Sequence, residues 1–309
     1  MAYDIIRPSS REEWLEHRKA GIGSSEVATI LGLNPYETPY QLWRRKLGLD
    51  EPKEETYAMR RGHYLEASVA ATWEGELGRV VDKDSEGDWL IINKERPYLR
   101  VSPDRTYTLE DGSKGILECK TTNLRIDPLN VPSQWFTQLQ YQLGVAELER
   151  GSIAWLMAGY EFGYIDLIFV PDFFDRLVAE VDHFVNYNLW EKVPPELRNV
   201  SDVVLKYKTH VAGETKEANE RTYMDWCDLK DVREEIAALT ERKDQLEDRL
   251  KEAFGSAEAL VYDGSTLATW KAPSKPTERI DTKALKEAHP ELVAKFTTQT
   301  LGSRRLLIK

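Results

Sequence analysis

The chain is organised around residues 102–122, which read SPDRTYTLEDGSKGILECKTT. The second half of this stretch has the apolar and β-branched side chains that are typical of a strand. Side chains alternate between the two faces of a strand, so Glu118 and Lys120 are predicted to project from the same face. Asp104 precedes the turn-forming tetrapeptide Glu-Asp-Gly-Ser. The stretch therefore predicts a hairpin with a carboxylate on one arm and Glu-x-Lys on the other.

Two carboxylates and an ammonium group on one face are costly unless a ligand uses them. A hard divalent cation would bind the oxygens of Asp104 and Glu118, and Lys120 would hold a water molecule or stabilise developing charge. A solvated strand face often has the same residue types. From these residues alone, a metal site and a solvated face are both open interpretations.

The composition is that of a globular chain with a substantial core. The sequence has 309 residues, of which 41% are hydrophobic, with nine Trp and fourteen Tyr. This length is enough for one large domain with an appendage, or for two domains. No apolar run approaches the roughly 18 residues of a membrane-spanning helix, and the N-terminus lacks the apolar segment of a signal peptide. We therefore expect a cytoplasmic protein with no membrane partner.

Cysteine content and net charge limit the function classes. The two cysteines, Cys119 and Cys227, fit a reducing compartment and are too few for a Cys-only zinc or iron–sulfur site within one chain. The formal net charge of −11 argues against a diffuse basic surface for nucleic acid. A local site in which metal ions neutralise the charge is still compatible with this value.

Two segments before the central stretch carry further candidate residues. After Gly21-Ile-Gly23, the sequence Ser24-Ser25-Glu26 predicts a helix start, which is either an anion site or an ordinary serine cap. A longer helix is expected at residues 57–77, with Glu66 at the edge of its apolar stripe. Glu66 either reaches the candidate metal site or is a solvated helix carboxylate.

A helix from residue 134 to about residue 147 is rich in glutamine. Gln134, Gln138 and Gln142 follow one another at intervals of four residues, with Gln140 between them. Glutamine can hydrogen-bond phosphates and base edges without adding charge. The stripe is therefore either a nucleic-acid contact or a solvated helix face.

The clearest boundary in the chain is Pro194-Pro195. We expect a domain at residues 1–195 and an appendage at residues 196–309. Apolar positions three and four apart predict an amphipathic helix at residues 225–254, either docked on the protein or paired in a coiled coil. A hairpin around Asp-Gly at residues 260–270, a helix at residues 282–295 and a last strand at residues 304–308 are predicted to follow.

The order of these features resembles the PD-(D/E)XK nuclease core, an α/β (α+β) fold with a central mixed β-sheet flanked by helices. The closer resemblance is to the YqaJ-type phage recombinases and the lambda exonuclease family, over roughly residues 8–190. Five segments carry it: Trp14–Glu26, Arg61–Glu66, Ser102–Asp104, Leu117–Thr121 and Trp135–Tyr141. Their joint occurrence, in the order that the family has, is far more specific than any one of them.

The resemblance implies catalytic roles for four residues and a metal-ligand role for the backbone of a fifth. Asp104 and Glu118 would coordinate Mg²⁺, or Mn²⁺ in its place, and the backbone carbonyl of Cys119 would be a further ligand. Lys120 would position or activate the attacking water. Glu66 would hold a metal-bound water or a second metal ion.

The resemblance also implies a DNA-binding set. Arg18 and Ser25 match the pocket that grips the 5′-terminal phosphate in the lambda-type enzymes. Gln140 matches a helix glutamine that contacts the same region, and Gln138 is assigned to the same set. A terminal phosphate carries more charge than an internal one, so Arg18 would favour it through a bidentate contact.

The implied function is a Mg²⁺-dependent 5′→3′ exonuclease that acts on double-stranded DNA ends and makes 3′ overhangs for a single-strand annealing protein. The alternatives are an endonuclease or single-strand nuclease on the same core, and a non-catalytic module that binds DNA ends. The resemblance also implies a homo-oligomer, with a ring-like trimer as the family precedent, and a phage or prophage origin in a bacterial host. The part after residue 195 lies outside the resemblance, and no chemistry is assigned to it.

Overall fold

The computed structural model of the protein describes residues 2–50, 56–273, 280–298, 302 and 304–308. The chain forms two compact units, Met1–Val203 and Val204–Lys309. The division falls a few residues after the boundary that the sequence predicts at residue 195. Within the described ranges, no helix is both long enough and apolar enough to cross a membrane.

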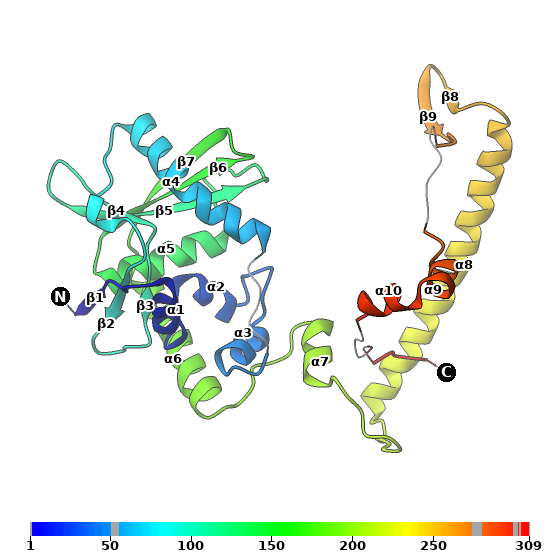
Figure 1. Ribbon diagram of the computed structural model, residues 1–309, viewed down its shortest axis with the longest axis horizontal. Coiled ribbons are helices and arrows are strands. Elements are labelled where there is room, and N and C mark those ends of the chain that lie inside the picture. The colour runs from blue at the N-terminus through cyan, green and yellow to red at the C-terminus, as the bar shows by residue number, and fades with distance from the viewer. Residues whose placement is uncertain (1, 51–55, 274–279, 299–301, 303, 309) are drawn as a thin grey trace. The chain divides into compact units, whose positions relative to one another are not determined.

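A mixed four-stranded sheet lies at the centre of the first unit (Figure 1). Its strand order is β4–β5–β6–β7, in which β5 and β6 run parallel and the two outer pairs are antiparallel. The strands are β4 (Arg105–Thr108), β5 (Lys114–Thr122), β6 (Arg150–Met157) and β7 (Glu161–Ile168). Parallel neighbours need a crossover connection, and helix α5 (Ser133–Ala146) is part of it.

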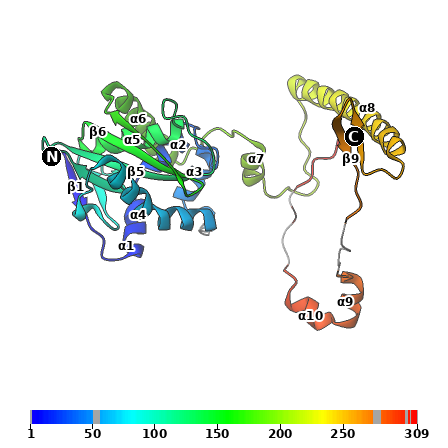
Figure 2. The same cartoon turned by 90° about the horizontal axis from the view of Figure 1, so that it is seen from above.

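Helices cover both faces of this sheet (Figure 2). On one face, Trp73 of α4 (Tyr57–Leu77) packs with Leu117 and Cys119 of β5 in a hydrophobic core. On the other face, Glu118 of β5 receives hydrogen bonds from side chains of α5. Consecutive residues of β5 therefore face different helices, as strand geometry requires. The predicted core, a mixed sheet flanked by helices, is confirmed.

A second sheet of three antiparallel strands, in the order β1–β2–β3, belongs to the same unit. Short helices follow β1, and two of them begin with a side-chain cap: Ser10 caps α1, and Thr38 caps α3 ahead of a proline. The elements are β1 (Tyr3–Ile6), α1 (Arg11–Lys19), α2 (Ser24–Ile30), α3 (Pro39–Lys46), the 3₁₀ turn η1 (Lys83–Ser85), β2 (Leu90–Asn93) and β3 (Arg100–Val101). A bridge between Ile22 and Leu99 ties the turn between α1 and α2 to the chain before β3.

Helix α6 (Pro171–His183) packs against the outer side of α5, where Tyr141 contacts Phe174 with 6.2 Å between the ring centroids. It continues into the π-helical segment η2 (Phe184–Trp190), and α7 (Val200–Lys206) follows the two prolines. Helix α5 therefore lies between the sheet and α6, and most of its side chains are buried.

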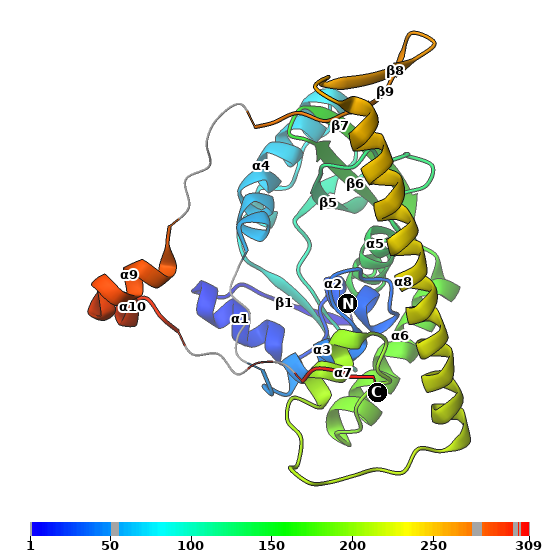
Figure 3. The same ribbon diagram turned by 90° about the vertical axis from the view of Figure 1, so that its right-hand side faces the viewer.

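The second unit contains the long helix α8 (Glu220–Phe254), of which only Phe254 is buried. The hairpin β8 (Ala259–Tyr262) and β9 (Ser265–Thr269) follows α8 (Figure 3). Its turn residues Asp263 and Gly264 have φ values of 47° and 74°, the left-handed pair that an Asp-Gly hairpin turn requires. Two short helices come next, α9 (Thr282–Ala288) and α10 (Pro290–Lys295).

The prediction of a last strand at residues 304–308 is wrong, because these residues have no strand partner and no regular secondary structure. The predicted helix at residues 282–295 is instead two helices, since Pro290 starts α10 after His289, whose φ of −136° and ψ of 62° are not helical. A proline is favourable in the first turn of a helix and interrupts one that is already under way.

Candidate active site

The two strands of the central hairpin stop pairing next to the candidate catalytic residues. Pairing between β4 and β5 ends at Arg105 and Leu117, whereas β5 continues to Thr122 with only β6 beside it in the described sheet. Asp104 precedes β4, and its Oδ2 accepts a hydrogen bond of 2.7 Å from the Cys119 N–H. The carboxylate thus satisfies a backbone donor that a longer β4 would have paired. The hairpin brings Asp104 and the Glu-x-Lys residues together, as the sequence predicts.

Glu118 and Lys120 share one face of β5 and contact each other. Lys120 Nζ lies 2.7 Å from Glu118 Oε1 and 2.9 Å from Gln138 Oε1. The side-chain amide of Gln138 donates to Glu118 Oε1, and that of Gln142 donates to Glu118 Oε2 at 2.8 Å. Both oxygens of the buried carboxylate are therefore held by α5 and by the lysine.

Gln142 is a site residue that the sequence-based assignment missed. It is fully buried, and its Nε2 donates both to Glu118 and, at 3.3 Å, to Ser24 Oγ. Its Oε1 is buried without a hydrogen-bond partner among the described residues. The interval of four residues from Gln138 was a usable signal, because residues four apart share a helix face.

Three carboxylates from different elements influence one another here. Burial raises the pKa of Asp104 well above its ordinary value, and the charges of Glu118 and Glu66 raise it further. Burial and Glu118 likewise raise the pKa of Glu66, although nearby His63 works in the opposite direction. Burial alone would lower the pKa of Lys120, but Glu118 and Asp104 outweigh it and the pKa lies above the ordinary value. The carboxylates together disfavour their own negative charge, which is the electrostatic condition for binding a cation.

The donor set suits a hard cation. Asp104, Glu118 and Glu66 offer carboxylate oxygens, which are the ligands of Mg²⁺ and Mn²⁺ and not of soft metals. Among the described residues, no group of three or more His, Cys, Asp or Glu side chains is arranged to hold a metal ion as it stands. A cation at Glu118 would share oxygens that now accept from Gln138 and Gln142.

The thiol of Cys119 is separate from these carboxylate oxygens. Its side chain belongs to the hydrophobic core beneath α4, on the face of β5 opposite Glu118. Burial, followed by the charge of Asp104, raises the pKa of the thiol well above its ordinary value, so it stays protonated and unreactive. The ligand role of its backbone carbonyl stays a prediction.

One cavity of about 630 Å³ joins these residues to the N-terminal helices. Its lining includes Glu66, Asp104, Glu118, Lys120 and Gln138, and also Arg18 and Ser25. The structure therefore brings together both halves of the predicted site, which are far apart in the sequence.

Arg18 and Ser25 lie side by side in this cavity. Arg18 lies in the last turn of α1, and its Nη2 donates to the Ser25 hydroxyl at 3.4 Å. The guanidinium lies over the Trp14 ring, 4.6 Å from the centroid, which fixes its plane. Burial lowers the pKa of Arg18, although a guanidinium remains charged under all physiological conditions. This is a preformed cationic group beside a hydroxyl donor.

Gln140 lies elsewhere. The side chain is fully buried, its Nε2 donates to the Ile168 carbonyl, and its Oε1 accepts from the Val170 N–H, both at 2.8 Å. It is not part of the lining of the cavity. This position does not support the predicted contact with DNA and instead makes Gln140 a structural link between α5 and the start of α6.

Residues 13–149 match the family model of the YqaJ-like viral recombinase domain. This segment of the chain is similar to the YqaJ-like viral recombinase domain. All predicted catalytic and DNA-binding residues fall within it. The protein is 29% identical to the uncharacterized protein YqaJ of Bacillus subtilis (strain 168). The match covers 94% of this chain and 92% of the relative.

Solved structures that are similar to part of this chain include an alkaline exonuclease, LHK-Exo, from Laribacter hongkongensis. It shares 21% identity and a TM-score of 0.45 over 56% of this chain and 90% of that one. A phage related exonuclease from Haemophilus somnus 129PT shares 11% identity and a TM-score of 0.39, over 52% of this chain and 90% of that one.

Proposed function

We propose that the protein is a metal-dependent deoxyribonuclease that degrades linear double-stranded DNA in the 5′→3′ direction and leaves 3′ single-stranded overhangs. The observation that supports this most directly is the shared cavity. It places the carboxylate–lysine group and the Arg18–Ser25 pair on one continuous surface within the YqaJ-like domain. A terminal phosphate and a neighbouring phosphodiester could then be held at the same time.

Hydrolysis of a phosphodiester develops negative charge on the phosphoryl oxygens and on the leaving 3′-oxygen. Asp104, Glu118 and Glu66 would hold Mg²⁺ or Mn²⁺, with the Cys119 carbonyl as a further ligand, and the metal would supply Lewis-acid stabilisation of this charge. Lys120 contributes a fixed positive charge, and its ammonium can orient a water molecule toward the phosphorus. Gln138 orients both Lys120 and Glu118 through its amide.

The direction of degradation would come from the other end of the cavity. Arg18 can donate two parallel hydrogen bonds to a terminal phosphate, and Ser25 can donate one. A 5′-hydroxyl end offers neither the extra charge nor the extra oxygens. The enzyme is therefore expected to start at 5′-phosphorylated ends.

The test compares three DNA substrates in the presence of Mg²⁺: linear duplex with 5′-phosphate, linear duplex with 5′-hydroxyl, and closed circular duplex. The expected order of cleavage rates is phosphate, then hydroxyl, with circles resistant. Cleavage of circles at a comparable rate would point to an endonuclease and overturn the exonuclease proposal. Binding of ends without any cleavage would overturn the assignment of an enzyme.

Two variants connect the function to the cavity. Arg18→Ala is expected to slow cleavage of the 5′-phosphorylated duplex and to leave the 5′-hydroxyl duplex nearly unaffected. Equal losses on both linear substrates would contradict the phosphate-binding role. Asp104→Asn should abolish cleavage of all substrates, since it removes a proposed metal ligand.

The product implies a partner. A 3′ overhang is the substrate of a single-strand annealing protein, so we place this enzyme at the first step of phage-type homologous recombination in the cytoplasm of a bacterial host. The trimer remains part of the proposal on the family resemblance. Sizing the protein in solution tests it directly.

A further inference from the structure

A buried carboxylate stands directly behind the Arg18–Ser25 pair. Glu26 follows Ser25 in α2, and its side chain is 8% exposed. Its Oε2 accepts a hydrogen bond of 2.8 Å from the Gly23 N–H at the start of the helix. Glu26, which accepts from the N-cap residue of α2, is thus the immediate neighbour of Ser25, which lines the cavity.

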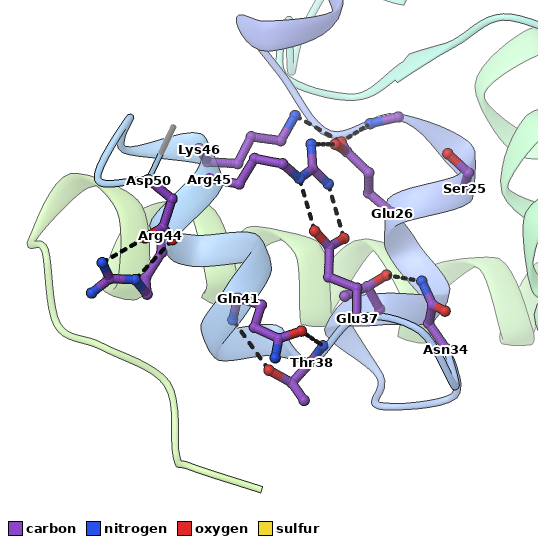
Figure 4. Close-up of polar contacts among 12 residues, drawn as sticks. Ser25, Glu26, Asn34, Glu37, Thr38, Gln41, Arg44, Arg45, Lys46 and Asp50 are labelled. Carbon is purple, nitrogen blue, oxygen red and sulfur yellow. Dashed lines mark hydrogen bonds and ion pairs between the residues drawn. The ribbon is translucent and has the colours of Figure 1, made fainter. Parts of the chain in front are cut away.

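The side chain of Lys46 extends from α3 to this carboxylate (Figure 4). Its Nζ lies 2.7 Å from Glu26 Oε2, and the same ammonium donates to the carbonyls of Gly21, at 2.5 Å, and Arg18, at 3.3 Å. An ammonium group has three N–H donors, so these acceptors use all of them. Lys46, with only 6% of its side chain exposed, fastens the end of α1 and the turn after it to the first turn of α2.

Arg45 completes the group. Its Nη1 donates to Glu26 Oε1 at 3.0 Å, and its other nitrogens form a bidentate pair with Glu37 at 2.8 and 2.9 Å. Figure 4 shows Arg45 and Lys46 pointing toward Glu26, whereas Arg44, the preceding residue of α3, points away toward Asp50. Arg44 forms its own bidentate pair with Asp50 at 2.7 and 2.8 Å.

A buried ion pair is a poor means of gaining stability, because apolar residues of the same size often do as well. What this pair does is fix positions. The backbone atoms that it binds belong to Arg18, Gly21 and Gly23, which bracket the turn between the two cavity-lining residues Arg18 and Ser25. Small displacements of a positioned group are costly, and a shift of about 1 Å can reduce a rate about 100-fold.

We propose that Glu26 and Lys46 are a positioning pair that sets the separation and orientation of Arg18 and Ser25, and thereby the preference for a 5′-phosphate. This inference rests on the proposed function of that cavity. Neither residue touches the DNA in this proposal; each acts through the backbone that carries the two phosphate-binding side chains.

The test is Lys46→Met, which keeps the length of the side chain and removes the ammonium. For the wild type and the variant, kcat and KM are measured on linear duplex with 5′-phosphate and with 5′-hydroxyl. The advantage of the phosphorylated substrate in kcat/KM is expected to fall by about tenfold or more, chiefly through KM, because the misplaced guanidinium no longer holds the phosphate. Cleavage of the 5′-hydroxyl duplex should change by less than about twofold.

Arg44→Met is the matched control on the same helix. It removes an ion pair next to Lys46 whose partners are on α3 and the turn after it, so it is expected to lower the melting temperature without changing the substrate preference. Glu26→Gln serves as a second variant in case Lys46→Met does not fold. Its amide oxygen can still accept from Gly23, and it should lose part of the preference.

The outcomes separate this inference from the function beneath it. A wild-type enzyme with no preference for 5′-phosphate would overturn the proposed polarity. A preference that is present in the wild type and unchanged in both Lys46→Met and Glu26→Gln would overturn the positioning pair alone. Equal losses on both linear substrates in these variants would also overturn it, because the pair would then support the whole domain.

Discussion

The substitution Gln140→Leu tests how much the fully buried amide of Gln140 contributes to the free energy of unfolding. Leucine is similar in size and removes the hydrogen bonds to the Ile168 carbonyl and the Val170 N–H. A hydrogen bond contributes about 1 kcal/mol net to stability, so the loss of two corresponds to about 2 kcal/mol. In a unit of this size, that is a fall of about 4–8 °C in the melting temperature. DNA binding and cleavage should be unchanged at temperatures at which the variant is folded.

The measurement is urea unfolding followed by tryptophan fluorescence, together with cleavage of linear duplex. Gln138→Leu is the matched control. Gln138 lies two residues earlier on the same helix but contacts Glu118 and Lys120. It should give the opposite result, with cleavage reduced by about tenfold or more and a smaller change in stability. If Gln140→Leu instead left the free energy of unfolding intact and weakened binding to DNA ends, the structural role argued for Gln140 would be refuted.

Three further predictions follow from the site. Lys120→Ala should reduce cleavage at least about 100-fold while the circular dichroism spectrum and end binding persist; an active variant would refute the site assignment. Addition of Mg²⁺ should raise the melting temperature of the wild type, and Asp104→Asn should lose this response. In EDTA the variant should be at least as stable as the wild type, because burial and Glu118 disfavour the charged form of Asp104. An unaltered response of the variant to Mg²⁺ would count against the metal site. Burial alone would raise the pKa of Glu26, but Lys46 and Arg45 bring it below 4.5. The stabilisation of the folded state by ionised Glu26 is therefore present above about pH 4.5 and is lost as the pH falls through the folded-state pKa of Glu26. Glu26→Gln should accordingly flatten the acid side of a plot of unfolding free energy against pH. Parallel curves for the wild type and the variant would contradict this.

The central hairpin was predictable because its signals are local. Strand alternation places Glu118 and Lys120 on one face whatever the rest of the chain does, and the Glu-Asp-Gly-Ser turn brings Asp104 back toward them. The Asp263-Gly264 turn was predictable for the same reason, since few residue pairs adopt two consecutive positive φ values.

The faces of α5 were not predictable in this way. A helix with one solvated side shows its orientation in its polar residues, but α5 lies between the sheet and α6, and buried side chains surround it. Gln140 and Gln142 are both fully buried, yet they point to different neighbours. Residue type alone cannot distinguish a glutamine that holds a candidate catalytic carboxylate from one that links two segments of backbone.

The wrong prediction of a strand at residues 304–308 has a related cause. The apolar residues Leu306 and Leu307 favour extended structure, but a strand is stable only with a partner that pairs with its N–H and C=O groups. Both side chains are exposed, at 75% and 78%. Extended propensity without a neighbouring strand leaves the segment irregular.

The two halves of the cavity are linked by more than proximity. Gln142 donates from one amide nitrogen to Glu118, on the proposed catalytic side, and to Ser24, next to Ser25, on the proposed phosphate-binding side. Tyr141, its neighbour, donates to the Ile22 carbonyl in the turn that Lys46 also holds. Helix α5 therefore sets the distance between the group that would bind a 5′-phosphate and the group that would cut the chain. In the proposed exonuclease that distance would fix which phosphodiester is hydrolysed, so α5 would act as the spacer of the site.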